Sequence, residues 1–156
     1  DVGCGAGRDS AYFADEKLGV TAIDVVGALL EEARQKIKNV DFQEMDMCDI
    51  NFGEKSFEGI WCMSSISDVE KKDADIVIKN FCRVLKENGV LYISAREGSD
   101  EKVFERGFFN DLPRFYSFYS QKELEELLLK NKFKLLTSSI SDCQGTKWVE
   151  IFAKKE

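Results

Sequence analysis

Short apolar runs alternate with longer amphipathic segments along the 156 residues of this chain. The apolar runs have the length of buried strands, and the amphipathic segments carry apolar residues at helical spacing. Such regular alternation predicts an α/β fold with a mostly parallel sheet that helices cover on both faces. The predicted strands are 20–24, 40–45, 57–63, 90–94, 133–140 and 147–153, and the predicted helices are 8–18, 28–37, 73–86 and 120–130.

No helix separates the last two strands, so we expect them to form an antiparallel hairpin that turns at Gln144-Gly145. The stretch 96–119 shows neither a strand nor a helix pattern, and we predict that it is irregular. No internal repeat or shift in composition marks a second domain, and a chain with 44% apolar residues can form one core. We therefore expect a single domain over residues 1–156.

Three glycines at alternate positions open the chain, in Asp1-Val2-Gly3-Cys4-Gly5-Ala6-Gly7. Glycines this close together let a backbone pass near itself or near a ligand. The dinucleotide fingerprint G-x-G-x-x-G would need its third glycine where this chain has Arg8, and a long side chain there fits a diphosphate poorly. The spacing D-x-G-x-G-x-G suits a smaller zwitterionic ligand, because Asp1 can accept from an ammonium group while the turn leaves room for a carboxylate.

The residue types of the chain exclude several chemistries. The sequence has no histidine, which removes Ser-His-Asp and Cys-His nucleophiles and histidine-ligated metals, and we predict no metal site. Its five cysteines are scattered without a CxxC pair, which favours free thiols in a reducing cytoplasm. The net charge of -7 argues against a general nucleic-acid surface, and the sequence contains no apolar run of about 18 residues to span a bilayer.

The sequence begins at Asp1 rather than at a methionine. A strand that leads into a glycine turn ordinarily carries several more apolar residues than Val2 alone provides. We therefore expect the N-terminus to be truncated, with a helix and most of the first strand preceding this sequence.

Four segments resemble successive motifs of class I S-adenosylmethionine-dependent methyltransferases, and are closest to the small stand-alone type with a methyltransferase-11/25-like domain. They are DVGCGAGRDS, EMDMCDI, SFEGIWCMSSISDV and RVLKENGVLYIS. The last segment departs from the usual RVLKPGG run, because Glu87-Asn88 replaces Pro-Gly. The resemblance implies a Rossmann-like, doubly wound, mostly parallel sheet with a C-terminal antiparallel hairpin. It also implies S-adenosyl-L-methionine as the cofactor.

The resemblance implies a role for particular residues of those motifs. Asp24, 17 residues after Gly7, would accept both ribose hydroxyls, and Asp46 would take the adenine amino group. Residues 62–64 would lie alongside the methionine part of the cofactor. The implied cofactor-binding residues are Asp1, Gly3, Cys4, Gly5, Gly7, Arg8, Asp24, Val25, Asp46, Met47, Cys62, Met63 and Ser64.

Simpler interpretations stand beside these roles. The simpler interpretation of Asp24 is a cap for the helix that starts at Gly27. Arg8 either begins a helix or faces the cofactor carboxylate, and both interpretations stay open. We expect Cys4 to be a small residue that fills a tight turn rather than a nucleophile.

The acceptor side of the site is much less defined by the resemblance. Related enzymes often have a Leu-His pair where this chain has Ser67-Asp68, so no proton-transfer residue can be carried over and the catalytic residues are unknown. Loops at the carboxyl edge of such sheets carry specificity. The candidate substrate-binding residues are Arg96, Glu97, Phe109 and Tyr116.

The function we predict is methyl transfer from S-adenosylmethionine to an unidentified small-molecule acceptor. The leaving group of a sulfonium is neutral, so the task of the protein is to hold acceptor, methyl and sulfur in line. Two alternatives remain: a protein that binds the cofactor without turnover, and an NAD(P)-binding oxidoreductase. We expect a cytoplasmic monomer or weak homodimer that binds neither nucleic acid nor membranes.

Overall fold

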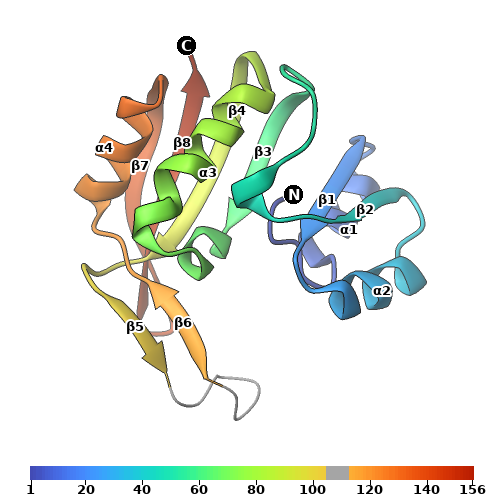
Figure 1. Ribbon diagram of the computed structural model, residues 1–156, viewed down its shortest axis with the longest axis horizontal. Helices are drawn as coiled ribbons and strands as arrows, with labels where there is room; N and C mark the ends of the chain where they lie inside the picture. Colours follow the sequence, from blue (N-terminus) through green and yellow to red (C-terminus); the bar gives the residue numbers. More distant parts are fainter. Residues whose placement is uncertain (105–112) are drawn as a thin grey trace. The chain divides into compact units, whose positions relative to one another are not determined.

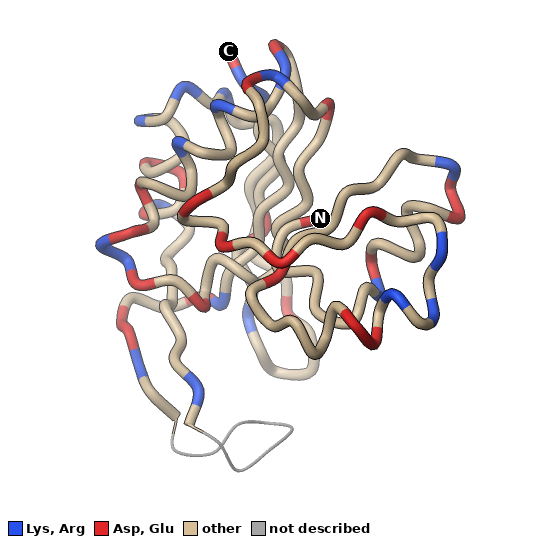
Figure 2. Tube along the Cα trace, turned by 45° about the vertical axis from the view of Figure 1, so that its right-hand side comes forward, with Lys and Arg blue, Asp and Glu red and all other residues tan. Residues whose placement is uncertain are grey.

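The computed structural model describes residues 1–104 and 113–156 of the chain. The described residues form two compact units, 1–51 and 52–156, and each is considered by itself (Figure 1). The expectation of one domain over 1–156 stays a prediction. Acidic and basic residues follow one another closely along both units (Figure 2).

The first unit is a two-stranded parallel sheet with a helix before each strand. Strands β1 and β2 pair in register from Val20↔Val40 to Asp24↔Glu44, and Val2 adds a parallel bridge to Ile23. Its elements are α1 (Arg8–Asp15), β1 (Val20–Asp24), α2 (Gly27–Lys36), β2 (Val40–Glu44) and the short 3₁₀ helix η1 (Met47–Asp49). The core is built from Ala22, Leu30, Ala33 and Phe42.

Helix α1 ends three residues before the predicted end at position 18. Lys17 adopts φ 67°, in the left-handed region that stops a helix. The N–H of Leu18 donates to the carbonyl of Phe13, and the N–H of Lys17 donates to Ala14. Leu18 therefore belongs to the C-terminal cap. The prediction had extended the helix to Leu18 because this residue is apolar.

The second unit contains a four-stranded sheet in the order β3-β4-β8-β7. Its strands are β3 (Phe57–Met63), β4 (Leu85–Arg96), β7 (Phe133–Cys143) and β8 (Thr146–Lys155). β3 and β4 are parallel, whereas β8 runs antiparallel to both of its neighbours. The predicted hairpin of β7 and β8 is confirmed, and its two-residue turn has φ 53° at Gln144 and φ 79° at Gly145. Two successive positive φ angles are typical of the type I′ turn that matches strand twist.

Helices α3 (Lys71–Val84) and α4 (Gln121–Lys130) pack on this unit, and α3 crosses the sheet in Figure 1. α3 ends at Val84, two residues earlier than predicted, because Leu85 is extended and pairs with Phe57 of β3. α4 begins as predicted at a serine cap, where the Ser120 hydroxyl accepts the N–H of Glu123 at 3.2 Å.

The prediction that 96–119 is irregular was wrong for two segments. β5 (Glu101–Phe104) and β6 (Arg114–Ser117) pair antiparallel, from Glu101↔Ser117 to Phe104↔Arg114. Each strand has only four residues, which is too short for a strand pattern to show above the charges around it. A short 3₁₀ helix, η2 (Ser65–Asp68), was also not predicted. In the part of the chain that the structure describes, every helix is too short or too polar to cross a bilayer.

Candidate functional site

The three N-terminal glycines form a tight turn that is fixed to the end of β1. Gly3, Gly5 and Gly7 have φ angles of 70°, 55° and 82°, which side chains with a Cβ rarely adopt. The N–H groups of Gly3 and Cys4 both donate to the carbonyl of Ile23, at 2.8 and 3.1 Å. The N–H of Gly7 closes the turn on the carbonyl of Cys4 at 2.9 Å.

Gly5 and Gly7 are needed for different reasons. A Cβ at Gly7 would lie 2.7 Å from the side chain of Ile37 and 3.0 Å from that of Phe42, so Gly7 allows the turn to pack on the core. A Cβ at Gly5 would meet no atom within 4 Å. The backbone around Gly5 therefore borders open space, as a turn that holds a ligand must.

Asp24 braces this turn from the end of β1. One oxygen of its carboxylate accepts the N–H of Gly5 at 2.8 Å, and the other accepts the N–H of Val26 at 2.9 Å. Val26 is the N-cap residue of α2, so Asp24 bonds to the residue just before the helix, and its ribose role stays a prediction. Each carboxylate oxygen has two lone pairs, so Asp24 keeps capacity for further donors.

Asp1 precedes the glycine turn in the chain. Its carboxylate accepts the hydroxyl of Ser10, which is fully buried in α1. The carbonyl of Asp1 accepts the N–H of Ile23 at 2.9 Å. The Asp1 carboxylate is thus held in place by a buried hydroxyl.

Arg8 forms an ion pair with its neighbour Asp9, with 2.7 Å between Nε and Oδ1, and its side chain is 80% exposed. It begins α1 as predicted. Its proposed contact with a cofactor carboxylate stays a prediction.

The two cysteines among the predicted site residues are not nucleophiles at neutral pH. Burial, with the carboxylate of Asp24 second, raises the pKa of Cys4 to about 11. Burial also raises the pKa of Cys62 to about 11, and its Sγ lies 3.2 Å from the hydroxyl of Ser65. Since only the thiolate attacks readily, both thiols are inert. Cys4 instead packs against the core of the first unit.

Asp46 and Met47 follow β2, at the same sheet edge as Asp24. The carboxylate of Asp46 accepts the N–H of Cys48 at 2.8 Å and begins η1. The N–H of Met45 donates to the carbonyl of Asp24, which joins the ends of the two parallel strands. The first unit therefore brings together Asp1, the glycine turn, Asp24 with the exposed Val25, Asp46 and the half-buried Met47.

Cys62, Met63 and Ser64 lie in the second unit, at the end of β3. Cys62 is fully buried, whereas Met63 is 41% exposed. Ser64 has φ 67°, and its N–H donates to both the carbonyl and the hydroxyl of Ser94 on β4.

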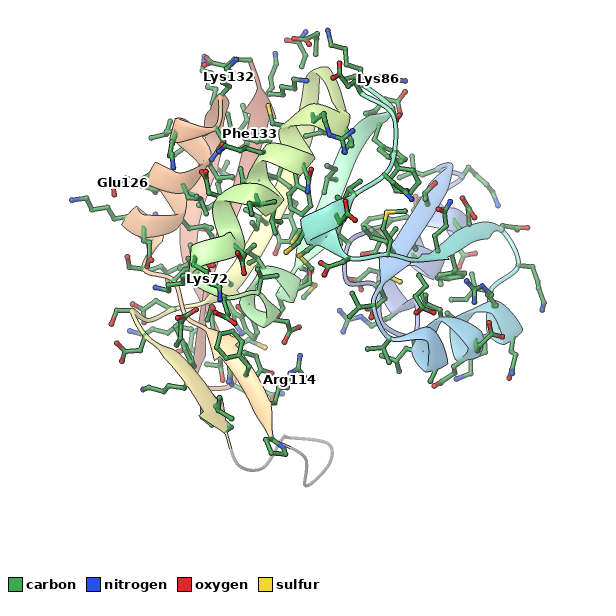
Figure 3. All side chains as sticks on the ribbon, in the orientation of Figure 1. Lys72, Lys86, Arg114, Glu126, Lys132 and Phe133 are labelled. Carbon is green, nitrogen blue, oxygen red and sulfur yellow. The ribbon has the colours of Figure 1, made fainter. Side chains whose placement is uncertain are left out.

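Two of the candidate substrate-binding residues lie together. The guanidinium of Arg96 is 5.3 Å from the ring centre of Tyr116 and 5.8 Å from that of Trp148. Arg114 of β6, labelled in Figure 3, also packs on Tyr116, with its guanidinium 4.8 Å from the ring centre. The same guanidinium forms an ion pair with Asp68 at 3.2 Å. Such contacts between a cation and an aromatic ring are attractive.

The other two candidates are Glu97 and Phe109. Glu97 is exposed, and Phe109 lies outside the described residues. Sequence reasoning missed Trp148 and Arg114. Trp148 lies opposite Arg96 through the pairing of β4 with β8, and Arg114 lies two residues before Tyr116 on the unpredicted strand β6. Within residues 1–104 and 113–156, no group of three Cys, Asp or Glu side chains converges as a metal site would.

Comparison with known proteins gives matches over the whole chain. Residues 1–89 match the family model described as a methyltransferase domain. An O-methyltransferase of Aspergillus sclerotiorum is 28% identical over 148 residues, which is 87% of this chain and 54% of that protein. The chain spans only 36% to 59% of the length of the curated relatives it matches first.

Solved structures show the same fold. A methyltransferase from Methanosarcina mazei superposes with a TM-score of 0.87 at 20% identity, over 99% of this chain and 90% of that one. A 1,6-didemethyltoxoflavin-N1-methyltransferase from Burkholderia thailandensis has a TM-score of 0.81 at 24% identity, over 99% and 69% of the two chains. That structure contains bound 1,6-didemethyltoxoflavin and S-adenosylhomocysteine. The predicted α/β architecture is confirmed by these likenesses.

Proposed function

Because the chain belongs to the methyltransferase domain family, we propose that it binds S-adenosylmethionine and transfers the methyl group to a small-molecule acceptor. One observation supports this proposal most strongly. Asp24 braces a glycine turn whose middle residue borders open space, and its carboxylate keeps acceptor capacity beside that space. A carboxylate acceptor beside an open turn fits a ligand that carries hydroxyl groups, such as the ribose of S-adenosylmethionine.

Each group of the first unit has a part in holding the cofactor. The Asp24 carboxylate accepts the ribose hydroxyls, and each charge-assisted bond contributes roughly 1.5–3 kcal/mol. Asp1 accepts from the ammonium group, with its carboxylate oriented by Ser10. Asp46 accepts from the adenine amino group, while Val25 and Met47 offer apolar contact to the ring.

The cofactor supplies a methyl group on a positively charged sulfur that leaves as a neutral sulfide. The residues of this chain therefore need to position the acceptor rather than to activate a leaving group. The chain has no histidine, and its buried cysteines stay protonated. An acceptor that is already nucleophilic, such as a thiolate or an amine, needs no general base.

The cluster of Arg96, Tyr116 and Trp148 is our candidate for the acceptor surface, with Glu97 and Phe109 as further candidates. Aromatic rings and a guanidinium at the end of β4 suit a small, planar or anionic acceptor. We further propose that the protein works in the cytoplasm, as a monomer or weak homodimer. All five cysteines are free in the structure, which fits a reducing compartment.

Titration calorimetry of the full-length protein with S-adenosylhomocysteine and with NADH tests the cofactor. We expect binding of the first compound only. Binding of NADH alone would favour the oxidoreductase and overturn the proposal.

Transfer of tritium from methyl-labelled S-adenosylmethionine into a metabolite extract tests turnover. We expect a labelled small molecule, and much less of it in a control with the Asp24→Ala variant at the same low cofactor concentration. Cofactor binding without any labelled product would instead favour the protein that binds without turnover.

A further inference from the structure

The backbone of Ser64 adopts an unusual conformation directly after β3. Its φ of 67° lies in the left-handed region, where side chains with a Cβ are uncommon and which often marks functional turns. Ser64 is also the residue from which the 3₁₀ helix η2 starts, and its carbonyl accepts the N–H of Ser67 at 3.2 Å. Something in the surrounding structure must hold this conformation in place.

Ser94 supplies that restraint from the neighbouring strand. The N–H of Ser64 donates to the carbonyl of Ser94 at 3.1 Å and to its hydroxyl at 3.0 Å. Ser94 is only 2% exposed and pairs with Met63 in the β3–β4 register. The carbonyl bond continues the strand pairing, whereas the hydroxyl bond is specific to a serine or threonine at this position.

The turn decides where the side chains beside Ser64 point. Met63 is 41% exposed, while the hydroxyl of Ser65 is directed toward the buried thiol of Cys62 at 3.2 Å. If Ser64 relaxed to an ordinary conformation, the direction of the chain after Met63 would change. The direction of the chain after Met63 thus depends on the bond that the Ser64 N–H donates to Ser94.

We infer that Ser94 is a positioning residue for the part of the cofactor site that takes the methionine tail. The inference rests on the proposed function, and on the family resemblance, which implies that residues 62–64 contact the methionine part of the cofactor. Ser94 itself is buried and acts through the backbone of Ser64. Loss of its hydroxyl should therefore affect the tail of the ligand and leave the nucleoside part bound as before.

The test compares two ligands that differ by that tail, S-adenosylhomocysteine and adenosine, by calorimetry on the full-length protein. For Ser94→Ala we expect S-adenosylhomocysteine to bind about 5-fold more weakly, with adenosine affinity within about 2-fold of wild type. Ser94→Thr keeps the hydroxyl and should restore the wild-type ratio of the two affinities. Equal weakening of both ligands, or no weakening, overturns the inference.

Ser117→Ala is the matched control. Ser117 is a fully buried serine of the same unit, and its hydroxyl donates to the carbonyl of Val69 at 2.6 Å. Its loss should lower the melting temperature as much as Ser94→Ala does, but leave the ratio of the two affinities unchanged. A ratio that changes equally in the control overturns the inference, because it would show a general effect of destabilisation.

Amide hydrogen exchange adds a readout that needs no ligand. The Ser64 amide should exchange faster in Ser94→Ala than in wild type or in Ser94→Thr, and unchanged exchange overturns the role of Ser94. If wild type shows this bond by exchange yet binds neither ligand, the proposed function fails. In that case the cofactor role of Ser94 fails with it, although the bond itself is real.

Discussion

Asp24 is the side chain on which the proposed site depends most, because it serves the turn and the ligand at once. Its carboxylate accepts from Gly5 and Val26, and in the proposal it also accepts from the ribose. We expect Asp24→Ala to weaken binding of S-adenosylhomocysteine roughly 10- to 100-fold, measured by calorimetry. Asp24→Asn, which keeps one acceptor oxygen, should lose less. An affinity equal to wild type in the alanine variant would exclude the ribose role.

The buried hydroxyl of Tyr119 lowers the stability of the folded state. The side chain is 1% exposed, and the hydroxyl has no hydrogen-bond partner among the described residues. Burial is also the main reason that the pKa of Tyr119 is raised. Removing an unsatisfied buried hydroxyl relieves a penalty of about 1–3 kcal/mol.

We therefore expect Tyr119→Phe to leave the free energy of unfolding in urea unchanged or to raise it by up to about 1 kcal/mol. Ser117→Ala is the contrast, because it removes a hydroxyl that is bonded to Val69 and Glu101, and it should destabilise. A loss of stability in Tyr119→Phe as large as in the contrast would show that the phenol has a partner.

The glycine turn is the first element whose parts can be separated by substitution. Gly7→Ala places a methyl group 2.7 Å from Ile37 and needs a left-handed φ of 82°. Gly5→Ala also has a left-handed φ, of 55°, but its methyl group meets open space. We expect both variants to lose about 1–2 kcal/mol from backbone strain, and Gly7→Ala to lose about 1–3 kcal/mol more from overpacking.

Chemical denaturation measures the difference in the free energy of unfolding between the two variants. Calorimetry measures their affinities for S-adenosylhomocysteine. The Gly5 variant should stay folded and yet bind S-adenosylhomocysteine more weakly, because its methyl group fills the space beside the turn. A Gly5 variant that binds like wild type would place the ligand elsewhere.

Asp75 joins α3 to the end of α4. Its carboxylate pairs with Lys79 on α3 and with Lys130 on α4, and it also accepts the amide of Asn131. The bond to Lys79, followed by those to Asn131 and Lys130, holds the pKa of Asp75 well below its usual range. A lowered folded pKa stabilises the fold above the unfolded value of about 4, and this stabilisation is lost as the pH falls below it.

Asp75→Asn should therefore lower the melting temperature by a few degrees at pH 7. The difference from wild type should shrink as the pH is lowered through 4 toward 2, because Asp75 becomes protonated in the unfolded chain while the folded carboxylate, with its lowered pKa, stays ionised. Melting curves across that range check the sign. A difference that is the same at pH 2 and pH 7 would show that the charge of Asp75 is unimportant.

The elements differed in how well the sequence predicted them. β1 and β3 match their predicted bounds, because each is mostly apolar and lies between polar or turn-forming residues. β5 and β6 were missed, since neither four-residue strand has a periodicity of its own and each is formed only through the other. The glycine turn and Asp24 were visible as a motif. Their hydrogen bond was not, because it joins backbone and side chain across 19 positions.

At the scale of the whole chain, the expectation of one domain predicts a single cooperative transition. Both tryptophans, Trp61 and Trp148, lie in the second unit, so their fluorescence reports on residues 52–156 alone. Far-ultraviolet circular dichroism reports on the helices of both units. We expect the two signals to melt at the same temperature. Separate midpoints would show that residues 1–51 unfold independently.

Cys143 ends β7 beside the hairpin turn and is exposed, whereas the other four cysteines are buried or half-buried. The thiols of Cys4 and Cys62 are moreover held in their unreactive form. A maleimide dye would thus attach preferentially at the tip of one hairpin, away from the glycine turn in sequence. The exposed thiol of Cys143 therefore allows site-specific fluorescence labelling without any engineered cysteine.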